Sequence, residues 1–144
     1  MISLHACDIA TDLALGTAIR AKAKYIACVP CCHKELLDQY TMPGLEPLTK
    51  FGVFKARFND VLTDSMRALK LEAEGYKVSV VEYISPLDTP KNLLIRATRT
   101  GKVNHRAKAE YDAVRRTLGT TSELDRRCAE LDNEFFVTDE DLMG

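Results

Sequence analysis

Residues 1–33, MISLHACDIATDLALGTAIRAKAKYIACVPCCH, carry the pattern around which the predicted fold is built. A short apolar run, Ile2-Ser3-Leu4, leads into a polar turn over 5–8, and a helical pattern follows over 10–23. A second apolar run over 24–29 ends in a turn over 30–33. A strand, a helix of this length and another strand form a βαβ unit, whose strands pair in parallel.

Reactive side chains follow both of these strands. His5-Ala6-Cys7-Asp8 comes after the first strand, and Pro30-Cys31-Cys32-His33 comes after the second. The carboxyl ends of parallel strands lie at the same edge of an open α/β sheet, and ligands bind at that edge. We therefore expect His5, Asp8, Cys31 and His33 to lie in one cleft. Asp8 also suits a helix N-cap, a structural role that is compatible with contacting a ligand.

Two further strands are predicted downstream, over 77–84 and 92–98, from their β-branched, aromatic and apolar side chains. The turn that joins them is too short for a crossover, so this pair is predicted to be antiparallel. The strands near 2–5 and 25–30 complete the set. The sequence therefore predicts an α/β fold with a mixed sheet of about four strands and helices on both of its faces.

Helical patterns fill the rest of the chain. One runs from Phe51 to Gly75, with Asn59 as a candidate cap and an apolar face predicted to be core, made of Phe58, Val61, Leu62, Met66, Leu69 and Ala73. Two shorter helices are predicted after Asn104 and Ser122. The irregular stretch 34–50 fits either a loop that shapes a substrate pocket or a plain connector. We divide the chain into 1–100 and a helical extension, 101–144, that ends in an acidic tail.

Composition indicates a globular domain. The chain has 144 residues, of which 46% are hydrophobic and 28% charged, with a net charge of −1. This charge argues against a strongly electrostatic nucleic-acid binder. Residues 91–127 hold ten Lys or Arg against four Asp or Glu, and 128–144 hold six acidic and no basic side chains. We interpret both blocks as solvated helix faces rather than as a nucleic-acid patch.

Cysteine usage and hydropathy point to the cytoplasm. The five cysteines are an odd number, and Cys31 and Cys32 are adjacent, so a disulfide framework is not expected. Reduced thiols are the ordinary state in the cytoplasm. The sequence shows neither an apolar run of the ~18 residues that a membrane helix needs nor a signal-peptide pattern. We expect a cytoplasmic protein without a membrane partner.

These motifs also carry a family resemblance. His5-Ala6-Cys7-Asp8-Ile9-Ala10-Thr11-Asp12 together with Pro30-Cys31-Cys32-His33 resembles one family of class I S-adenosylmethionine-dependent methyltransferases, which includes tRNA 2′-O-methyltransferases. A third block, 75–92, fits the same family. The resemblance implies that 2–4 and 25–29 are the fourth and fifth strands of a Rossmann-like methyltransferase sheet, whose last strand is reversed. The first three strands and the Gly-rich cofactor loop have no counterpart here, so we expect a fragment.

The resemblance also implies roles at the sheet edge. The expected cofactor is S-adenosylmethionine, and RNA is a possible methyl acceptor. The candidate catalytic residues are Asp8, Cys31 and His33. The candidate cofactor-binding residues are His5, Ala6, Cys7 and Asp12, and the candidate substrate-binding residues are Pro30 and Cys32. We expect no metal, and we expect the isolated chain to be inactive because half of the cofactor pocket is missing.

Other interpretations of the same residues stay open. His5, Cys7, Cys31, Cys32 and His33 are ligand types that zinc favours. Cys28-x-x-Cys31 has the spacing of a thioredoxin motif, although Cys28 falls inside a strand rather than before a helix. Small, soft cysteines also pack well where strands meet loops. A chain with an open first strand can be an inactive remnant that pairs with a second copy of itself or with the missing amino-terminal half.

Overall fold

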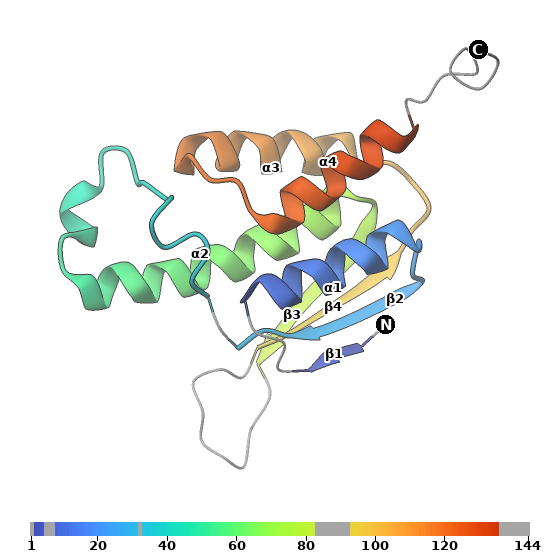
Figure 1. The fold of residues 1–144 in the computed structure, drawn as a ribbon, viewed down its shortest axis with the longest axis horizontal. Helices are drawn as coiled ribbons and strands as arrows, with labels where there is room; N and C mark the ends of the chain where they lie inside the picture. Colours follow the sequence, from blue (N-terminus) through green and yellow to red (C-terminus); the bar gives the residue numbers. More distant parts are fainter. Residues whose placement is uncertain (1, 5–7, 32, 83–92, 136–144) are drawn as a thin grey trace.

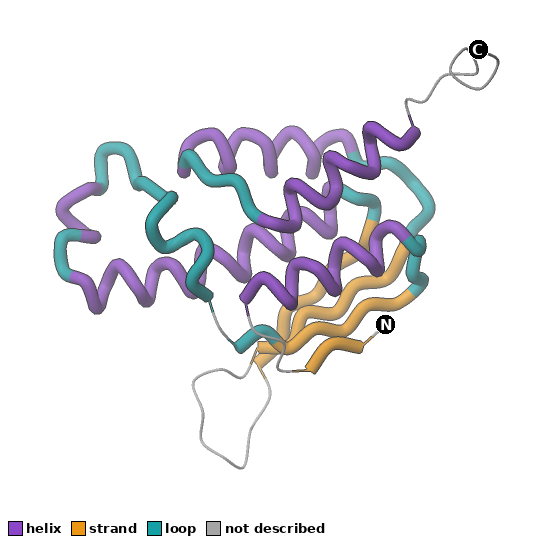
Figure 2. The backbone as a smooth tube through the Cα atoms, viewed as in Figure 1, coloured by secondary structure: helices purple, strands orange, loops and turns teal. Residues whose placement is uncertain are grey.

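The computed structural model describes residues 2–4, 8–31, 33–82 and 93–135 (Figure 1). Its elements, in chain order, are β1 (Ile2–Leu4), α1 (Asp8–Arg20), β2 (Tyr25–Val29), the 3-10 turn η1 (Glu46–Thr49), α2 (Gly52–Ala73), β3 (Tyr76–Glu82), β4 (Leu93–Arg99), α3 (His105–Leu118) and α4 (Glu123–Phe135). The predicted mixed α/β class is confirmed. Figure 2 separates the helical layer from the sheet by colour.

The sheet has the strand order β1-β2-β4-β3. β1 pairs in parallel with β2, and Ile2 lies opposite Ala27. β4 runs antiparallel to both of its neighbours, β2 and β3. The parallel β1–β2 pair and the antiparallel β3–β4 pair are the ones that connection length predicted, because the segment between β1 and β2 contains α1 and is long enough for a crossover, whereas the segment between β3 and β4 is not.

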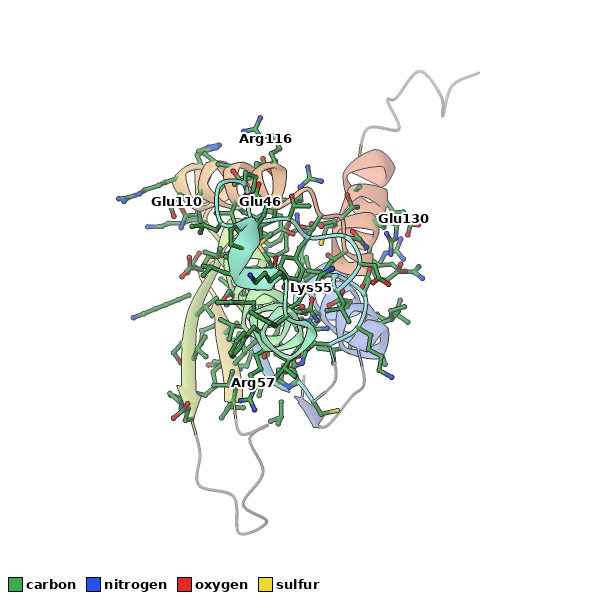
Figure 3. All side chains as sticks on the ribbon, turned by 90° about the vertical axis from the view of Figure 1, so that its left-hand side faces the viewer. Glu46, Lys55, Arg57, Glu110, Arg116 and Glu130 are labelled. Carbon is green, nitrogen blue, oxygen red and sulfur yellow. The ribbon has the colours of Figure 1, made fainter. Side chains whose placement is uncertain are left out.

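All the helices of the described residues lie on one face of the sheet (Figures 1 and 3). Ile26, Cys28, Ile95 and Ala97 line that face and pack against α1, α2 and α4. The opposite face carries Tyr25, Lys77, Arg96 and Thr98, which are exposed. Within the described part of the chain, the prediction of helices on both faces is therefore wrong. Strands that alternate apolar and polar side chains have one solvated face, as antiparallel sheets commonly do.

The carboxyl-terminal helices are part of this body. Leu124 and Cys128 of α4 belong to the same core cluster as Ile26 and Ile95. A second cluster joins α2, α3 and the loop before α2 through Tyr40, Met66, Ala73, Tyr111 and Leu118. The segment 101–144 thus contributes helices to both clusters.

Local sequence explains how α2 ends and how α3 begins. Gly75 follows α2 with φ of +90°, and a Cβ there would lie 2.8 Å from the carbonyl oxygen of Lys102. The Asn104 side chain caps α3 by accepting a hydrogen bond from the Ala107 amide at 3.0 Å. Asn59 is not a cap, because α2 begins seven residues earlier, at Gly52.

The predicted apolar face of α2 is only partly core. Met66 and Ala73, in the carboxyl-terminal half, are buried, whereas Phe58 is 36% and Val61 64% exposed. The prediction that Phe58 and Val61 face the core is therefore wrong. At this level of the helix, the opposite and more polar side, with Asn59 and Thr63, is the buried one.

Candidate functional site

The candidate site is the edge where β1 and β2 end and α1 begins. Some of the predicted site residues lie outside the described residues, namely His5, Ala6, Cys7 and Cys32. Asp8 is the first residue of α1, and the structure describes its backbone only. Pro30 is buried, and Cys31 is partly buried. The two remaining candidates, Asp12 and His33, are both buried in one polar network.

His33 points inward from the turn after β2 toward α2. Its Nε2 lies 2.7 Å from Asp64 Oδ1, and its Nδ1 lies 3.4 Å from Asp60 Oδ1. The Asn59 side-chain amide donates a 2.7 Å hydrogen bond to the His33 carbonyl. Three side chains of α2 therefore hold both the ring and the backbone of His33, whose side chain is only 1% exposed.

Arg67 extends this network to α1 and α4. Its Nε donates to Asp12 Oδ1 at 2.8 Å, and its Nη1 donates to Asp64 Oδ1 at 3.3 Å. The other Asp12 oxygen accepts from the Leu124 amide at 3.3 Å. Burial opposes the charge on Arg67, but the carboxylates of Asp12 and Asp64 outweigh burial and raise the pKa of the guanidinium.

The result is a continuous line of polar groups through the molecule. It begins at Asp60, whose side chain is 41% exposed, and continues through His33 and Asp64 to Arg67. It ends at Asp12 of α1, which lies beside the first turn of α4. This arrangement fixes the position of the turn after β2 relative to three helices. It also occupies both oxygens of Asp12 with protein donors.

The sequence predicted His33 and Asp12 of this line as site residues but not the residues of α2 that join them. Asn59, Asp60, Asp64 and Arg67 all lie in the middle of α2. Their i, i+4 and i, i+3 spacing places Asp60, Asp64 and Arg67 on one side of the helix, and that polar side was the available signal. A polar helix face is ordinarily solvated, so the pattern alone did not indicate burial.

The described thiols differ in environment. Cys28 and Cys128 are buried, whereas Cys31 is partly exposed at the candidate edge, and none of the three forms a disulfide. Burial raises the pKa of the Cys28 thiol to about 11, although the nearby Arg67 acts in the opposite direction. Cys28 therefore stays protonated and packed near neutral pH, as a structural cysteine does.

We expect thiol reagents to distinguish these cysteines. In the folded chain at pH 8, Ellman's reagent should modify Cys31 readily and leave Cys28 unmodified until the chain unfolds. Mass spectrometry of the labelled peptides measures this, with guanidinium-unfolded protein as the control in which all thiols react. Labelling of Cys28 at the rate of Cys31 in folded protein would contradict the assigned burial.

The structure describes only part of the residues behind the zinc and redox interpretations, because His5, Cys7 and Cys32 lie outside it. Among the residues that it describes, there is no group of three or more His, Cys, Asp and Glu side chains that could hold a metal ion. Cys28, the first cysteine of the C-x-x-C spacing, is 0% exposed within β2 rather than at the start of a helix. A catalytic thioredoxin-type cysteine needs exposure and a lowered pKa, and Cys28 has neither.

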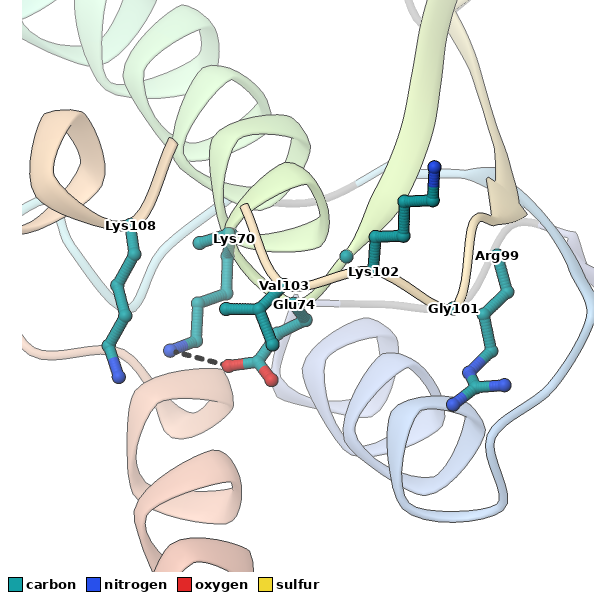
Figure 4. Close-up of a pocket in the computed structure, with 9 residues that line it drawn as sticks. Lys70, Glu74, Arg99, Gly101, Lys102, Val103 and Lys108 are labelled. Carbon is teal, nitrogen blue, oxygen red and sulfur yellow. Dashed lines mark ion pairs between the residues drawn. The ribbon is translucent and has the colours of Figure 1, made fainter. Parts of the chain in front are cut away.

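A separate hollow of about 280 Å³ lies at the other end of the sheet (Figure 4). Arg99, Lys102 and Lys108 line it together with Lys70, whose Nζ lies 3.1 Å from Glu74 Oε1. β4 runs antiparallel to β2, so the end of β4 at Arg99 lies beside the start of β2. This hollow is therefore remote from the edge that holds Cys31 and His33. Lys102 points away from the Lys70–Glu74 pair (Figure 4), so the four cations do not converge on one point.

Comparison with known proteins gives one family match and several distant relatives. Residues 1–39 match the model of a family described as a methyltransferase domain. The human and mouse proteins named glutathione S-transferase C-terminal domain-containing protein are 28% identical over 119 residues, which cover 65% of this chain and 19% of theirs. The Drosophila melanogaster homolog of that protein is 28% identical over 122 residues. The match covers 65% of this chain and 21% of the length of the Drosophila protein.

The chain thus spans about one fifth of the length of these curated relatives. No solved structure matches it. None of the helices in the described residues has the length and apolar character that crossing a membrane requires.

The stretch that the methyltransferase model matches contains β1, α1 and β2, which together make the candidate edge. The amino-terminal part of this chain is therefore similar to a methyltransferase domain.

Proposed function

We propose that this chain is the carboxyl-terminal half of a methyltransferase domain that uses S-adenosylmethionine. The observation that carries the proposal is the family match over 1–39, the stretch that folds into the parallel β1-α1-β2 unit. The reversed direction of β4, the last strand, supports it, because a class I methyltransferase sheet ends in a reversed strand.

Methyl transfer from a sulfonium mainly requires that donor and acceptor be held in line, and the acceptor often loses a proton. In this proposal Asp8, the first residue of α1, and Cys31 line the acceptor side of the edge. A carboxylate at this position is favourably placed by the helix dipole. His33 has a positioning role, since Asp60 and Asp64 hold its ring and Asn59 holds its backbone. RNA as the acceptor and the cytoplasm as the location remain proposals from the resemblance and the composition.

In this proposal the isolated chain lacks part of the cofactor pocket. Of the four candidate cofactor residues, only Asp12 has a described side chain, and Arg67 and the Leu124 amide occupy both of its oxygens. Asp12 therefore does not fit a cofactor contact in this arrangement. The sequence also shows no cluster of glycines after a strand. Half a pocket leaves most of a ligand in water, and association itself costs at least several kcal/mol.

Calorimetry of the 144-residue chain with S-adenosylmethionine tests the cofactor claim. The expected result is no one-to-one binding at low-micromolar concentration, and such binding would show that this chain builds a cofactor pocket by other means.

The methyltransferase claim has its own test, in which the full protein that contains these residues is assayed for transfer of a labelled methyl group to total RNA. Asp8→Asn should lower the rate with Arg106→Ala as a matched surface control. Full activity in Asp8→Asn would remove Asp8 from the reaction.

A further inference from the structure

The solvated face of the sheet carries positive charge and, within the described residues, no negative charge. Two rows of opposed residues cross β2, β4 and β3 on this face, namely Tyr25 with Thr98 and Lys77, and Ala27 with Arg96 and Ser79. Directly opposed residues of neighbouring strands point to the same face. This face is turned away from the helices (Figure 3). Lys77 and Arg96 are therefore the charged side chains that the described strands place on it.

Tyr25 is the aromatic centre of this surface. It is 59% exposed, and Lys24 Nζ lies 5.5 Å from the centroid of its ring. Arg96 of β4 is the diagonal neighbour both of Tyr25 on β2 and of Lys77 on β3. Diagonal neighbours in antiparallel strands are about 7–8 Å apart, within reach of long side chains. One aromatic ring thus lies among three cations, in an area about the size of a nucleotide.

The two strand cations are not balanced by carboxylates of the described residues. Basic side chains of the helices form ion pairs, as those of Arg67, Lys70 and Arg106 do. No ion pair within the described part of the chain involves Lys77 or Arg96. A surface whose charge its own neighbours do not balance attracts a ligand of the opposite sign. The complementary partner is therefore an anion.

The mixture of side chains selects the class of anion. Single-stranded nucleic acid binds to surfaces that combine cations for its phosphates with exposed aromatic rings for its bases. Thr98 and Ser79 are exposed on the same face and add hydroxyl groups for hydrogen bonds. The cores of protein–protein interfaces are depleted in lysine. Binding to a membrane surface relies on exposed apolar side chains, and Leu94 and Val81 of this face are only partly exposed. The surface therefore favours a single-stranded nucleic acid.

We propose that the solvated sheet face around Tyr25, Lys77 and Arg96 binds single-stranded nucleic acid. A base stacks on the Tyr25 ring, and Arg96 and Lys77 hold phosphates on the strands beside it. The surface lies near the start of β2, whereas the candidate edge lies where β2 ends. Strands that complete the proposed methyltransferase sheet would add beside β1, on the other side of β2 from Arg96 and Lys77. Binding at this surface is independent of methyl transfer, and either can fail without the other.

Fluorescence anisotropy of a labelled oligouridine, titrated with the 144-residue chain, tests the proposal. At ~50 mM salt the chain should bind an RNA of ~12 nucleotides with a micromolar dissociation constant, because few phosphates are held. Arg96→Gln should weaken binding at least ~5-fold, the effect of losing one charged hydrogen bond. Arg116→Gln is the matched control, since it removes the same charge from α3 in the helical layer (Figure 3). A chain that does not bind at ~100 μM, or equal effects of the two substitutions, would overturn the proposal.

Salt dependence separates the phosphate contacts from stacking. Lys77→Gln should lower the slope of log affinity against log salt by ~0.7, the value for one phosphate of a single strand. Tyr25→Leu should weaken binding at least ~5-fold without changing that slope, whereas Tyr25→Phe should keep the affinity, because stacking needs only the ring. Circular dichroism checks that each variant folds. Full affinity in Tyr25→Leu, or binding of poly-glutamate as tight as that of oligouridine, would contradict a nucleic-acid surface and indicate an acidic protein as the partner.

Discussion

Arg67→Ala is expected to lower the free energy of unfolding by about 3–5 kcal/mol, the usual cost of removing one partner from a buried ion pair. Arg67 is 3% exposed and joins Asp12 to Asp64. Without the guanidinium, the buried carboxylates of Asp12 and Asp64 would lose the cation that joins them. The loss would act on α1, α2 and α4 together, because Asp12 also holds the Leu124 amide.

Urea unfolding followed by circular dichroism measures this loss, with Arg106→Ala as the control. Arg106 pairs with Glu110 at 2.9 Å on the surface of α3, where its side chain is 89% exposed. Exposed pairs of this kind contribute at most ~1 kcal/mol. Equal effects of the two alanine substitutions would show that the buried line of charges is not what joins the three helices.

Ile95→Ala is expected to lower the free energy of unfolding by about 2–5 kcal/mol, the range for deleting a fully buried aliphatic side chain. Ile95 is 0% exposed in β4, where it lies between Cys28 of β2 and Val80 of β3. The cavity would open at the centre of the core cluster, between the sheet and α1, α2 and α4. The same urea titration gives the value.

Val80→Ala is the matched control for Ile95→Ala. Val80 sits directly opposite Ile95 on the neighbouring strand, but it is 49% exposed. Its truncation should cost less than ~1 kcal/mol, since most of the removed surface is already in water. A cost for Val80→Ala as large as that for Ile95→Ala would mean that the helices cover β3 as fully as they cover β4.

The strand directions could be read from the sequence because they depend on connection length. The segment between β1 and β2 is long enough to hold a helix and return parallel, and the segment between β3 and β4 is not. The glycine at 75 and the asparagine at 104 similarly mark a helix end and a helix start, since both act on their own backbone neighbourhood. Such features need only residues that are close in sequence.

The partners of the candidate site residues could not be read in the same way. Asp12 meets Arg67, 55 positions later, and the Leu124 amide, 112 positions later. His33 meets Asp64, 31 positions later. Residue types at the sheet edge predicted that Asp12 and His33 matter, but a contact over such separations depends on how α1, α2 and α4 pack together.

Helix α2 shows where the sequence alone is sufficient and where it is not. The periodic pattern determined that a long helix ends just before Gly75 and that Phe58 and Val61 share a side. Only the tertiary structure decided which side faces inward, because Asp12 and His33 present polar partners to Arg67 and Asp64 on the polar side of α2. Paired charges can be buried there, and the apolar side is left outside. The sequence by itself thus determined the helix and its two faces, whereas the charges brought to it by distant segments determined which face the molecule exposes.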